Sequence, residues 1–338
     1  MARAMATFSV CIPSYNAETV IGATIDSLIR QTFTDWECVV VDDGSTDRTE
    51  SVVRAFDDPR IRFFKNETNL GYPGNLQRCR DLAKGTFVYF LANDDILSPH
   101  ALQRTYEAFQ IAPDIAVITR PYYWFQNNDP AVAIRYTTPL DPQEDRIITA
   151  DDDDKTLRAI FEVMGQVTAL AFRNEMFTEP INPHVWPAHI QPFLEILKTR
   201  RGVFMHDYLI AVRLEHSQAR TVPKIYDPSP LWTWVNMMQS VFDGARWSRQ
   251  RKTGIDNIAR HVEGLVQLRK YSTLKCFVRE AWFYLKYRPL NALSPRYWFF
   301  AVGCLATPPG LLRKLVDRLM PMVTKAQAAN IQTIGATK

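Results

Sequence analysis

The chain has 338 residues, of which 46% are hydrophobic and 22% are charged. This composition excludes a disordered or fibrous protein, and the length suffices for a core that needs no disulfide or metal. Five widely spaced cysteines without a CxxC pair argue against a disulfide framework or a zinc ribbon and favour a reducing compartment.

The first 120 residues alternate between two hydrophobic periods. Short runs rich in β-branched and aromatic residues predict buried strands at 7–12, 37–41, 61–65, 87–91 and 115–119. Helical periodicity and capping residues predict helices at 19–30, 46–56, 70–83 and 99–109. Such alternation is typical of βαβ units, so we expect an α/β fold with a mostly parallel sheet flanked by helices.

The remaining chain is less regular. We expect further strands at 166–172 and 203–207 and helices at 151–163, 187–199, 231–242, 255–271 and 274–287. The strand signal fades after about residue 215, which predicts a domain at 1–216 and a helical C-terminal region at 217–338. No signal peptide is visible and no apolar run reaches the roughly 18–20 residues of a membrane span, so we expect a cytoplasmic protein.

The formal net charge of +4 is the sum of two parts of opposite sign. Residues 1–210 contain 20 Lys/Arg and 29 Asp/Glu, a net of −9, whereas residues 211–338 contain 20 and 7, a net of +13. This asymmetry indicates different partners for the two parts. A basic region suits an anionic membrane surface, a phosphorylated substrate or nucleic acid, but no motif that reads nucleic acid is present.

Polar loops follow the first four predicted strands directly. In parallel sheets ligands bind beyond the carboxyl ends of the strands. We therefore expect a single site built from Pro13–Asn16, Asp42–Ser45, Asn66–Gly71 and Ala92–Asp95.

Two pairs of adjacent carboxylates stand out in these loops. Asp94 and Asp95 repel each other unless a cation or hydrogen-bond donors neutralise them, and Mg²⁺ or Mn²⁺ bridging two phosphate oxygens would do so. A helix cap before Pro99 is the alternative. Asp42 and Asp43 precede a turn into a helix. A plain turn with a helix cap accounts for Gly44, Ser45 and Asp47, but it gives no reason for two adjacent carboxylates before them.

Other nucleotide-binding motifs are missing. There is no GxGxxG after the first strand, which disfavours a dehydrogenase, and Lys84-Gly85-Thr86 is not a P-loop.

In residues 6–216 the sequence resembles the family 2 glycosyltransferases, which have the GT-A fold. The resemblance rests on five motifs in the order and spacing of that family, namely Phe8–Ala17, Gln31–Glu37, Val39–Asp47, Asn69–Gly71 with Asn75, and Ala92–Asp95. It implies an enzyme of the hexosyl- or deoxyhexosyltransferase type that uses a nucleotide-diphosphate sugar and Mn²⁺ or Mg²⁺.

The resemblance also implies roles for single residues. The metal ligand would be Asp95, with Asp94 and the later His216 as further candidates. The nucleotide sugar would be bound by Pro13, Tyr15, Asn16, Glu18, Asp42, Asp43, Gly71, Asn75, Asn93 and Asp94.

One position departs from the family pattern. Family members carry a Glu-Asp pair at the start of a late helix, where the Asp is the general base, and this chain has Ala188 and His189 instead. His189 could serve as the base, bind a phosphate or the acceptor, or be structural. Glu195 and Asp207 are other nearby carboxylates. Bacterial abequosyltransferases of surface polysaccharides are similar in this substitution, and the departure leaves inverting and retaining stereochemistry both open.

The basic C-terminal third is rich in tryptophan, which suits a membrane interface. Helices that pack on the catalytic domain or on another subunit are the alternative. We expect an enzyme that adds a sugar to a glycan carried by polyprenyl pyrophosphate, peripheral to the inner membrane face. A nucleotidyltransferase of similar fold and a non-catalytic nucleotide-sugar-binding relative are the other hypotheses.

Overall fold

The computed structural model describes residues 6–215, 223–324 and 333–334. Tertiary contacts divide the chain into two compact units. The first unit contains residues up to Asp152, residues Glu162–Arg213 and the end of the chain from Ile331, and the second contains Asp153–Phe161 and Leu214–Asn330. The domain boundary expected at residue 216 falls in the segment 216–222, outside the described residues, so that division stays a prediction.

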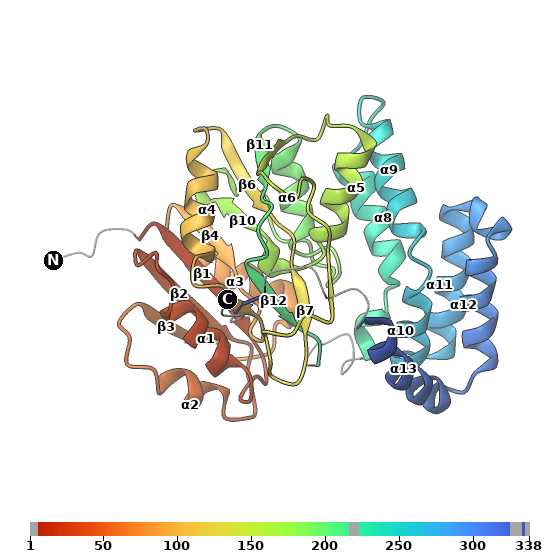
Figure 1. Cartoon of the computed structure of the whole chain (residues 1–338), viewed down its shortest axis with the longest axis horizontal. Coiled ribbons are helices and arrows are strands. Elements are labelled where there is room, and N and C mark those ends of the chain that lie inside the picture. Colours follow the sequence, from red (N-terminus) through yellow and green to blue (C-terminus); the bar gives the residue numbers. More distant parts are fainter. Residues whose placement is uncertain (1–5, 216–222, 325–332, 335–338) are drawn as a thin grey trace. The chain divides into compact units, whose positions relative to one another are not determined.

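The first unit is built on a mixed, mostly parallel sheet (Figure 1). The strand order is β3-β2-β1-β4-β10-β6-β11-β9, and only β10 and β9 run antiparallel to their neighbours. The bounds are β1 Phe8–Ser14, β2 Trp36–Asp42, β3 Ile61–Lys65, β4 Phe87–Phe90, β6 Ile115–Thr119, β9 Arg146–Ile148, β10 Ala171–Arg173 and β11 Arg201–Phe204.

Helices cover both faces of this sheet. The right-handed connections from β1 to β2 to β3 place α1 and α2 on one face, and the return from β3 to β4 places α3 on the other. Both sheet faces are therefore covered, and every residue of β1 and β2 is buried, which explains their continuous apolar runs. The helices of this unit are α1 Ile21–Ile29, α2 Thr49–Arg54, α3 Gly71–Leu82, α4 Ala101–Gln110 and α6 Ile190–Leu197.

A second, four-stranded sheet has the order β5-β12-β7-β8. Its strands are β5 Ile96–Leu97, β7 Tyr123–Phe125, β8 Arg135–Tyr136 and β12 Ile210–Arg213. The sequence did not predict it, because its strands are two to four residues long and show no period. It matters for the site, since β5 starts directly after Asp95 and β12 ends at Arg213.

Two predicted elements were wrong in detail. The strand expected at 166–172 is a 3₁₀ turn over Val167–Ala169 followed by the short β10. The single helix expected at 255–271 is two helices, α9 Ser248–Ala259 and α10 Gly264–Tyr271. The apolar pattern continues across the break, so periodicity alone could not show it.

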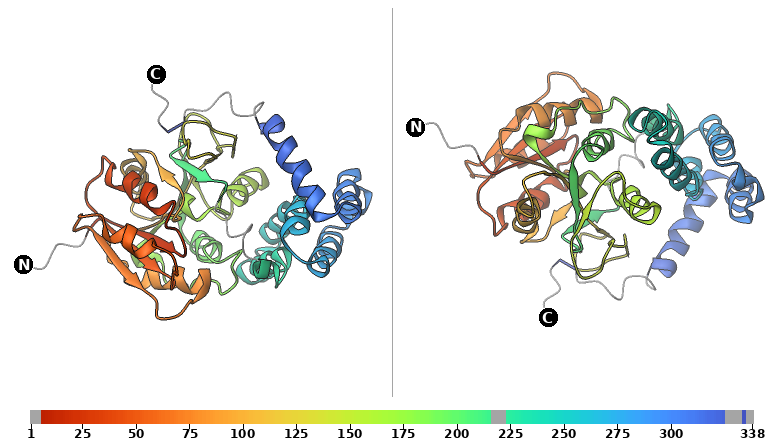
Figure 2. Two further views of the ribbon diagram at one scale, coloured as in Figure 1. Left: turned by 90° about the horizontal axis from the view of Figure 1, so that it is seen from below. Right: turned by 90° about the horizontal axis from the view of Figure 1, so that it is seen from above.

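The second unit is helical. Besides α9 and α10 it contains α5 Asp154–Val163 (in large part), α8 Pro230–Val241, α11 Leu274–Tyr287, α12 Pro295–Ala306 and α13 Pro309–Thr324, with short 3₁₀ turns at Pro223–Tyr226 and Pro289–Leu293 (η4). Figure 2 views several of these helices nearly end-on. No helix in the described residues is both long enough and apolar enough to span a bilayer.

Asp256 joins three arginines in the second unit. Its carboxylate lies 3.0 Å from Arg158, 2.6 Å from Arg260 and 2.8 Å from Arg288. Burial acts to raise the pKa of Asp256, but hydrogen bonds from Arg288 and Arg260 outweigh it and hold the pKa below its ordinary value. The network ties α9 to α5 and to the end of α11.

We expect Asp256→Asn to destabilise the chain by about 2 kcal/mol, because three cations lose their common partner. Because the native pKa is lowered, this stabilisation is present above the unfolded-state pKa near 4 and is lost as the pH falls through the native value. Thermal unfolding at pH 7 measures the effect. The exposed Asp243 provides the control, and an equal loss in Asp243→Asn would contradict the assignment.

Candidate active site

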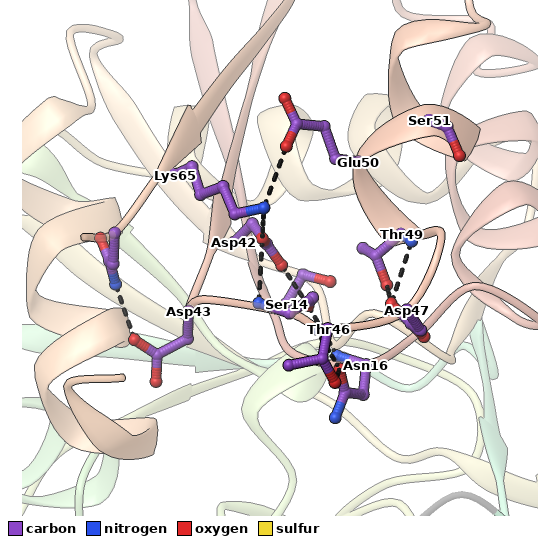
Figure 3. Close-up of polar contacts among 12 residues, drawn as sticks. Ser14, Asn16, Asp42, Asp43, Thr46, Asp47, Thr49, Glu50, Ser51 and Lys65 are labelled. Carbon is purple, nitrogen blue, oxygen red and sulfur yellow. Dashed lines mark hydrogen bonds and ion pairs between the residues drawn. The ribbon is translucent and has the colours of Figure 1, made fainter. Parts of the chain in front are cut away.

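The loops after β1 and β2 are joined by polar contacts (Figure 3). Asn16 has a positive φ of 47°, a conformation that asparagine tolerates better than most residues. Its backbone N–H donates to Ser45 Oγ at 2.8 Å, and its side-chain oxygen accepts from the Thr46 N–H at 2.9 Å. Asn16 therefore holds the two loops together.

The Asp42 carboxylate is bound by other residues of the protein. It is fully buried at the end of β2, accepts hydrogen bonds from the Ser45 hydroxyl and backbone N–H, and lies 3.9 Å from Lys65 Nζ. Lys65 also binds Glu50 at 3.0 Å (Figure 3). These contacts satisfy the Asp42 carboxylate and shape the turn after β2.

Asp43 differs from its neighbour. Its Oδ1 accepts from Asn66 Nδ2 at 2.7 Å and from the Leu70 N–H at 2.8 Å. Its Oδ2 makes no hydrogen bond within the described residues. Asp43 points in a different direction from Asp42 in Figure 3. One oxygen is therefore fixed by the protein, and the other can accept from a ligand.

Two residues of α3 complete this side of the site. Asn75 is buried and donates to the Val41 carbonyl at 2.9 Å and the Ser14 carbonyl at 3.4 Å, so it braces the ends of β2 and β1. Gly71 has φ +74° at the start of the helix, and a Cβ there would meet no atom within 4 Å. Gly71 thus leaves open space beside the segment that holds Asp43.

The loop after β1 carries an exposed aromatic ring, Tyr15, and a carboxylate, Glu18, that is paired with an arginine. Pro13 is buried inside β1, whereas Tyr15 is exposed. Glu18 accepts from the Arg48 N–H at 3.0 Å and from Arg48 Nε at 3.1 Å, and these contacts lower its pKa. Tyr15 is available to pack against a ligand, while Glu18 is engaged by Arg48.

Asp95 is buried, with 1% of its surface exposed. Its Oδ2 accepts from Thr168 Oγ1 at 2.6 Å and from the Gln166 side chain, and its Oδ1 accepts from the Arg213 N–H at 3.1 Å. Burial raises the pKa of Asp95 to about 6 although these hydrogen bonds lower it. The negative charge is therefore incompletely compensated, and Oδ1 keeps one acceptor position.

The neighbours of Asp95 are only half-buried. Asn93 and Asp94 form the turn between β4 and β5, and Arg213 Nε donates to the Asp94 carbonyl at 3.1 Å. The Arg213 side chain also donates to Asn128 and lies over the Phe125 ring. Sequence reasoning missed Gln166, Thr168 and Arg213, because they come from segments remote from the motif. His216 lies outside the described residues.

His189 lies just before α6 and is 5% exposed. Its Nδ1 is 3.1 Å from the Tyr72 hydroxyl, and its Nε2 has no hydrogen bond of good geometry in the described part of the chain. Burial lowers the pKa of His189 to about 4, and backbone groups of Gly165 and Met164 only partly oppose this. A base with such a pKa is weak near neutral pH. The contact with the Tyr72 hydroxyl would suit a residue that positions this side chain.

We expect His189 to make the fold acid-sensitive. In the unfolded chain its pKa would be 6.5 and in the folded chain about 4, so the unfolded state binds the proton first. Stability should fall by about 2 kcal/mol between pH 7 and pH 5. Denaturant unfolding of wild type and His189→Gln at both pH values isolates this term, because all other groups are shared. The exposed His100→Gln is the control, and equal pH dependence in wild type and His189→Gln would refute the buried neutral state.

The two other carboxylates considered near the base position have partners. Glu195 lies 3.0 Å from Lys198, and Asp207 lies 2.8 Å from Arg104. Asp207, His206 and Asp145 could each offer a metal ligand atom within 4.8 Å of the others. Arg104 also contacts Asp145 at 3.2 Å, so a cation already bridges the two carboxylates of this cluster.

Residues 9–162 match the model of the family described as Glycosyl transferase family 2. This confirms the resemblance seen in the motifs, and the mixed sheet with flanking helices confirms the predicted GT-A class of fold.

Several curated relatives match all or part of this chain. The UDP-Glc:alpha-D-GlcNAc-diphosphoundecaprenol beta-1,3-glucosyltransferase WfgD of Escherichia coli is 41% identical over 95 residues, 28% of this chain and 38% of the relative. The GalNAc(5)-diNAcBac-PP-undecaprenol beta-1,3-glucosyltransferase of Campylobacter jejuni is 41% identical over 101 residues, 29% of this chain and 33% of the relative. The chain thus matches about a third of the length of these two relatives. An uncharacterized glycosyltransferase of Haemophilus influenzae is 23% identical over 97% of this chain and 99% of its own.

Solved structures share the fold of the family 2 domain and much of the rest. Staphylococcus aureus TarS 1-349 in complex with UDP-GlcNAc has a TM-score of 0.64 at 15% identity and covers 91% of this chain and 92% of its own. The mannosyltransferase PcManGT from Pyrobaculum calidifontis, in complex with GDP-Man and Mn²⁺, has a TM-score of 0.51 at 14% identity, with 94% and 88% covered. At these identities the likeness shows the fold alone.

Proposed function

We propose that this chain is a glycosyltransferase that moves a sugar from a nucleotide-diphosphate donor to a glycan acceptor. The observation that carries the proposal is the placement of Asp43 and Asp95 at the carboxyl ends of β2 and β4 in a family 2 domain. Asp43 is held through Oδ1 and offers its Oδ2 to a nucleoside, and Asp95 holds a buried charge that a cation would offset.

The nucleoside end of the donor is assigned to the loops after β1, β2 and β3. Asp43 Oδ2 would accept from the base, Tyr15 would pack on its ring, and Gly71 leaves room beside them. Asn16, Asp42, Glu18 and Asn75 would act by holding these loops in place. UDP-sugars are the donors to test first, since WfgD is named for UDP-Glc and TarS is described with UDP-GlcNAc.

The residues present fit a divalent metal such as Mn²⁺ or Mg²⁺. Asp95 retains an acceptor position on Oδ1, and its raised pKa marks a carboxylate that a nearby cation would stabilise in its charged form. Asp95 would hold the metal, with Asp94 beside it. A bound divalent ion supplies positive charge to the donor diphosphate. In PcManGT the complex contains Mn²⁺.

The acceptor that we propose is a lipid-linked glycan. The names of WfgD and of the Campylobacter relative specify glycans on diphosphoundecaprenol or PP-undecaprenol. An acceptor of this type would place the reaction at the inner face of the plasma membrane, in the synthesis of surface polysaccharides.

One observation favours a second candidate function. The helix that starts after Ala188 and His189 has no carboxylate at those positions, and burial holds the pKa of His189 at about 4. A relative that binds a nucleotide sugar without transferring it would have these features.

A donor screen separates the two. Thermal shifts with UDP-, GDP- and dTDP-sugars, each with and without Mn²⁺, report binding, since a ligand of the native state raises its apparent stability. Release of the nucleoside diphosphate with an undecaprenyl-diphosphate glycan reports transfer. We expect both signals with one donor. Binding without release in any acceptor mixture would favour the second candidate, and no shift with any donor would refute both.

A further inference from the structure

The second unit has an exposed apolar surface on its last helices. We define the α11–α12 face as Trp282 of α11, Leu290 and Leu293 of η4, and Trp298, Phe299 and Val302 of α12. The exposed fractions include 61% for Trp282, 82% for Leu293 and 73% for Phe299. Single exposed apolar residues are ordinary, but six of them, two of which are tryptophans, on consecutive elements mark an interaction surface.

The two helices that carry the face are in contact with each other. The Tyr297 hydroxyl of α12 donates to the Ala281 carbonyl of α11 at 2.9 Å, and η4 links the end of one helix to the start of the other. Tyr297, Ala301 and Cys304 turn inward and are buried, so the core is already supplied by the opposite side of α12. The outer side of α12 is equally apolar, with Arg296 its only charged residue. A helix that is apolar all round needs a second apolar environment.

Charge is distributed one-sidedly around the face. Residues 264–316 contain nine Lys/Arg and a single acidic residue, Glu280. Glu280 is buried, where it accepts from the Ser229 hydroxyl and from the Leu231 N–H at 2.8 Å. This stretch therefore exposes cations such as Lys275 and Lys286. The carboxylates next to it, Glu263 and Asp227, are already paired with its Arg296 at 3.1 Å and its Arg279 at 2.7 Å.

We propose that the α11–α12 face docks on an anionic membrane surface, with its aromatic residues at the headgroup boundary and its lysines on lipid phosphates. Tryptophan prefers this boundary, and basic residues around an apolar helix face are attracted to anionic lipids. Helix α12 has 12 residues, about 18 Å in length, so it lies in the interface and does not cross the roughly 30 Å of hydrocarbon.

A second copy of the chain suits this face less well. A symmetric dimer brings the same patch of both subunits together, so Lys275 and Lys286 of one copy would meet the same cations of the other. The membrane proposal deepens the proposed function, because a lipid-linked acceptor resides at such a surface.

Vesicle co-sedimentation of the full chain, without donor or metal, tests the proposal. The probes are phosphatidylcholine vesicles with and without phosphatidylglycerol. We expect binding to the anionic vesicles to be at least about tenfold tighter and to weaken with salt. The double variant Trp298→Ser/Phe299→Ser should lose at least about tenfold in affinity. The double variant Lys275→Glu/Lys286→Glu should lose the preference for phosphatidylglycerol.

Ile111→Ser is the matched control, since Ile111 is an exposed aliphatic residue of the first unit. Thermal melts show whether each variant is folded. Donor binding is measured separately by thermal shift, so a defect of the sugar site is distinguished from a defect of membrane docking. The proposal is wrong if the wild-type chain does not bind anionic vesicles, or if the variants bind them with wild-type affinity. So would Trp298→Ser/Phe299→Ser converting a stable oligomer to monomers with vesicle binding unchanged.

Discussion

Asp95→Asn is expected to lower the rate of sugar transfer by at least about 10³-fold while leaving the chain folded. The carboxylate is a buried negative charge in the loop between β4 and β5, and its raised pKa indicates that the protein alone does not fully compensate it. Loss of one preorganised electrostatic group costs about 10²–10³ in rate, and here the metal contact is lost as well.

The asparagine variant separates charge from shape. It keeps an oxygen to accept from Thr168 or from the Arg213 N–H, whereas alanine would leave the donors of Gln166, Thr168 and Arg213 without a partner. Single-turnover transfer assays over a range of Mn²⁺ concentration measure the effect. Thermal melts with UDP and Mn²⁺ give an independent readout, and the stabilisation by Mn²⁺ should be absent in Asp95→Asn.

Asp42→Asn is the matched control for this experiment. Asp42 is equally buried at the end of β2, but Ser45 and Lys65 satisfy it. Its substitution should lower stability without altering the Mn²⁺ dependence of transfer. If Asp95→Asn retains more than about a tenth of the wild-type transfer rate, Asp95 is not the metal ligand.

The sequence predicted the edge of the sheet that carries the site, because strand ends can be read from buried apolar runs. It could not predict what each loop residue does there. Asp42 and Asp43 are adjacent and chemically identical, yet one is satisfied by its own turn and the other is held by Asn66 and Leu70 with an oxygen to spare. That difference depends on the direction of each side chain, which the pattern does not contain.

The residues that surround Asp95 were even harder to predict from the sequence. Its partners come from the 3₁₀ turn at Val167–Ala169 and from β12, and neither element has a periodic signal. The motif therefore located the carboxylate but not its burial. His189 shows the same limit, since its position suggested a base and only the fold around it reveals a pKa of about 4.

Asp43→Asn is expected to weaken binding of the nucleoside diphosphate by about 10–100-fold. A hydrogen bond to a charged acceptor contributes about 1.5–3 kcal/mol, and tenfold in Kd corresponds to about 1.4 kcal/mol. An amide retains one acceptor oxygen, which the Asn66 and Leu70 donors would hold. The position of the spare oxygen would then carry an NH₂ group that cannot accept from the base. Isothermal titration with UDP and Mn²⁺ measures this loss directly.

Asp47→Asn gives the comparison that makes the Asp43 result specific to the ligand. Asp47 lies in the same loop, but its two oxygens accept from the Thr49 side chain and backbone and from the Glu18 N–H. Losing its charge should destabilise the turn and change Kd by less than about threefold, because no acceptor for a ligand is removed. If both variants weaken UDP equally, Asp43 acts by holding the loop and its spare oxygen has no part in recognising the base. If only Asp43→Asn weakens UDP and Mn²⁺ affinity stays as in wild type, the nucleoside contact and the metal contact are separate functions of β2 and β4.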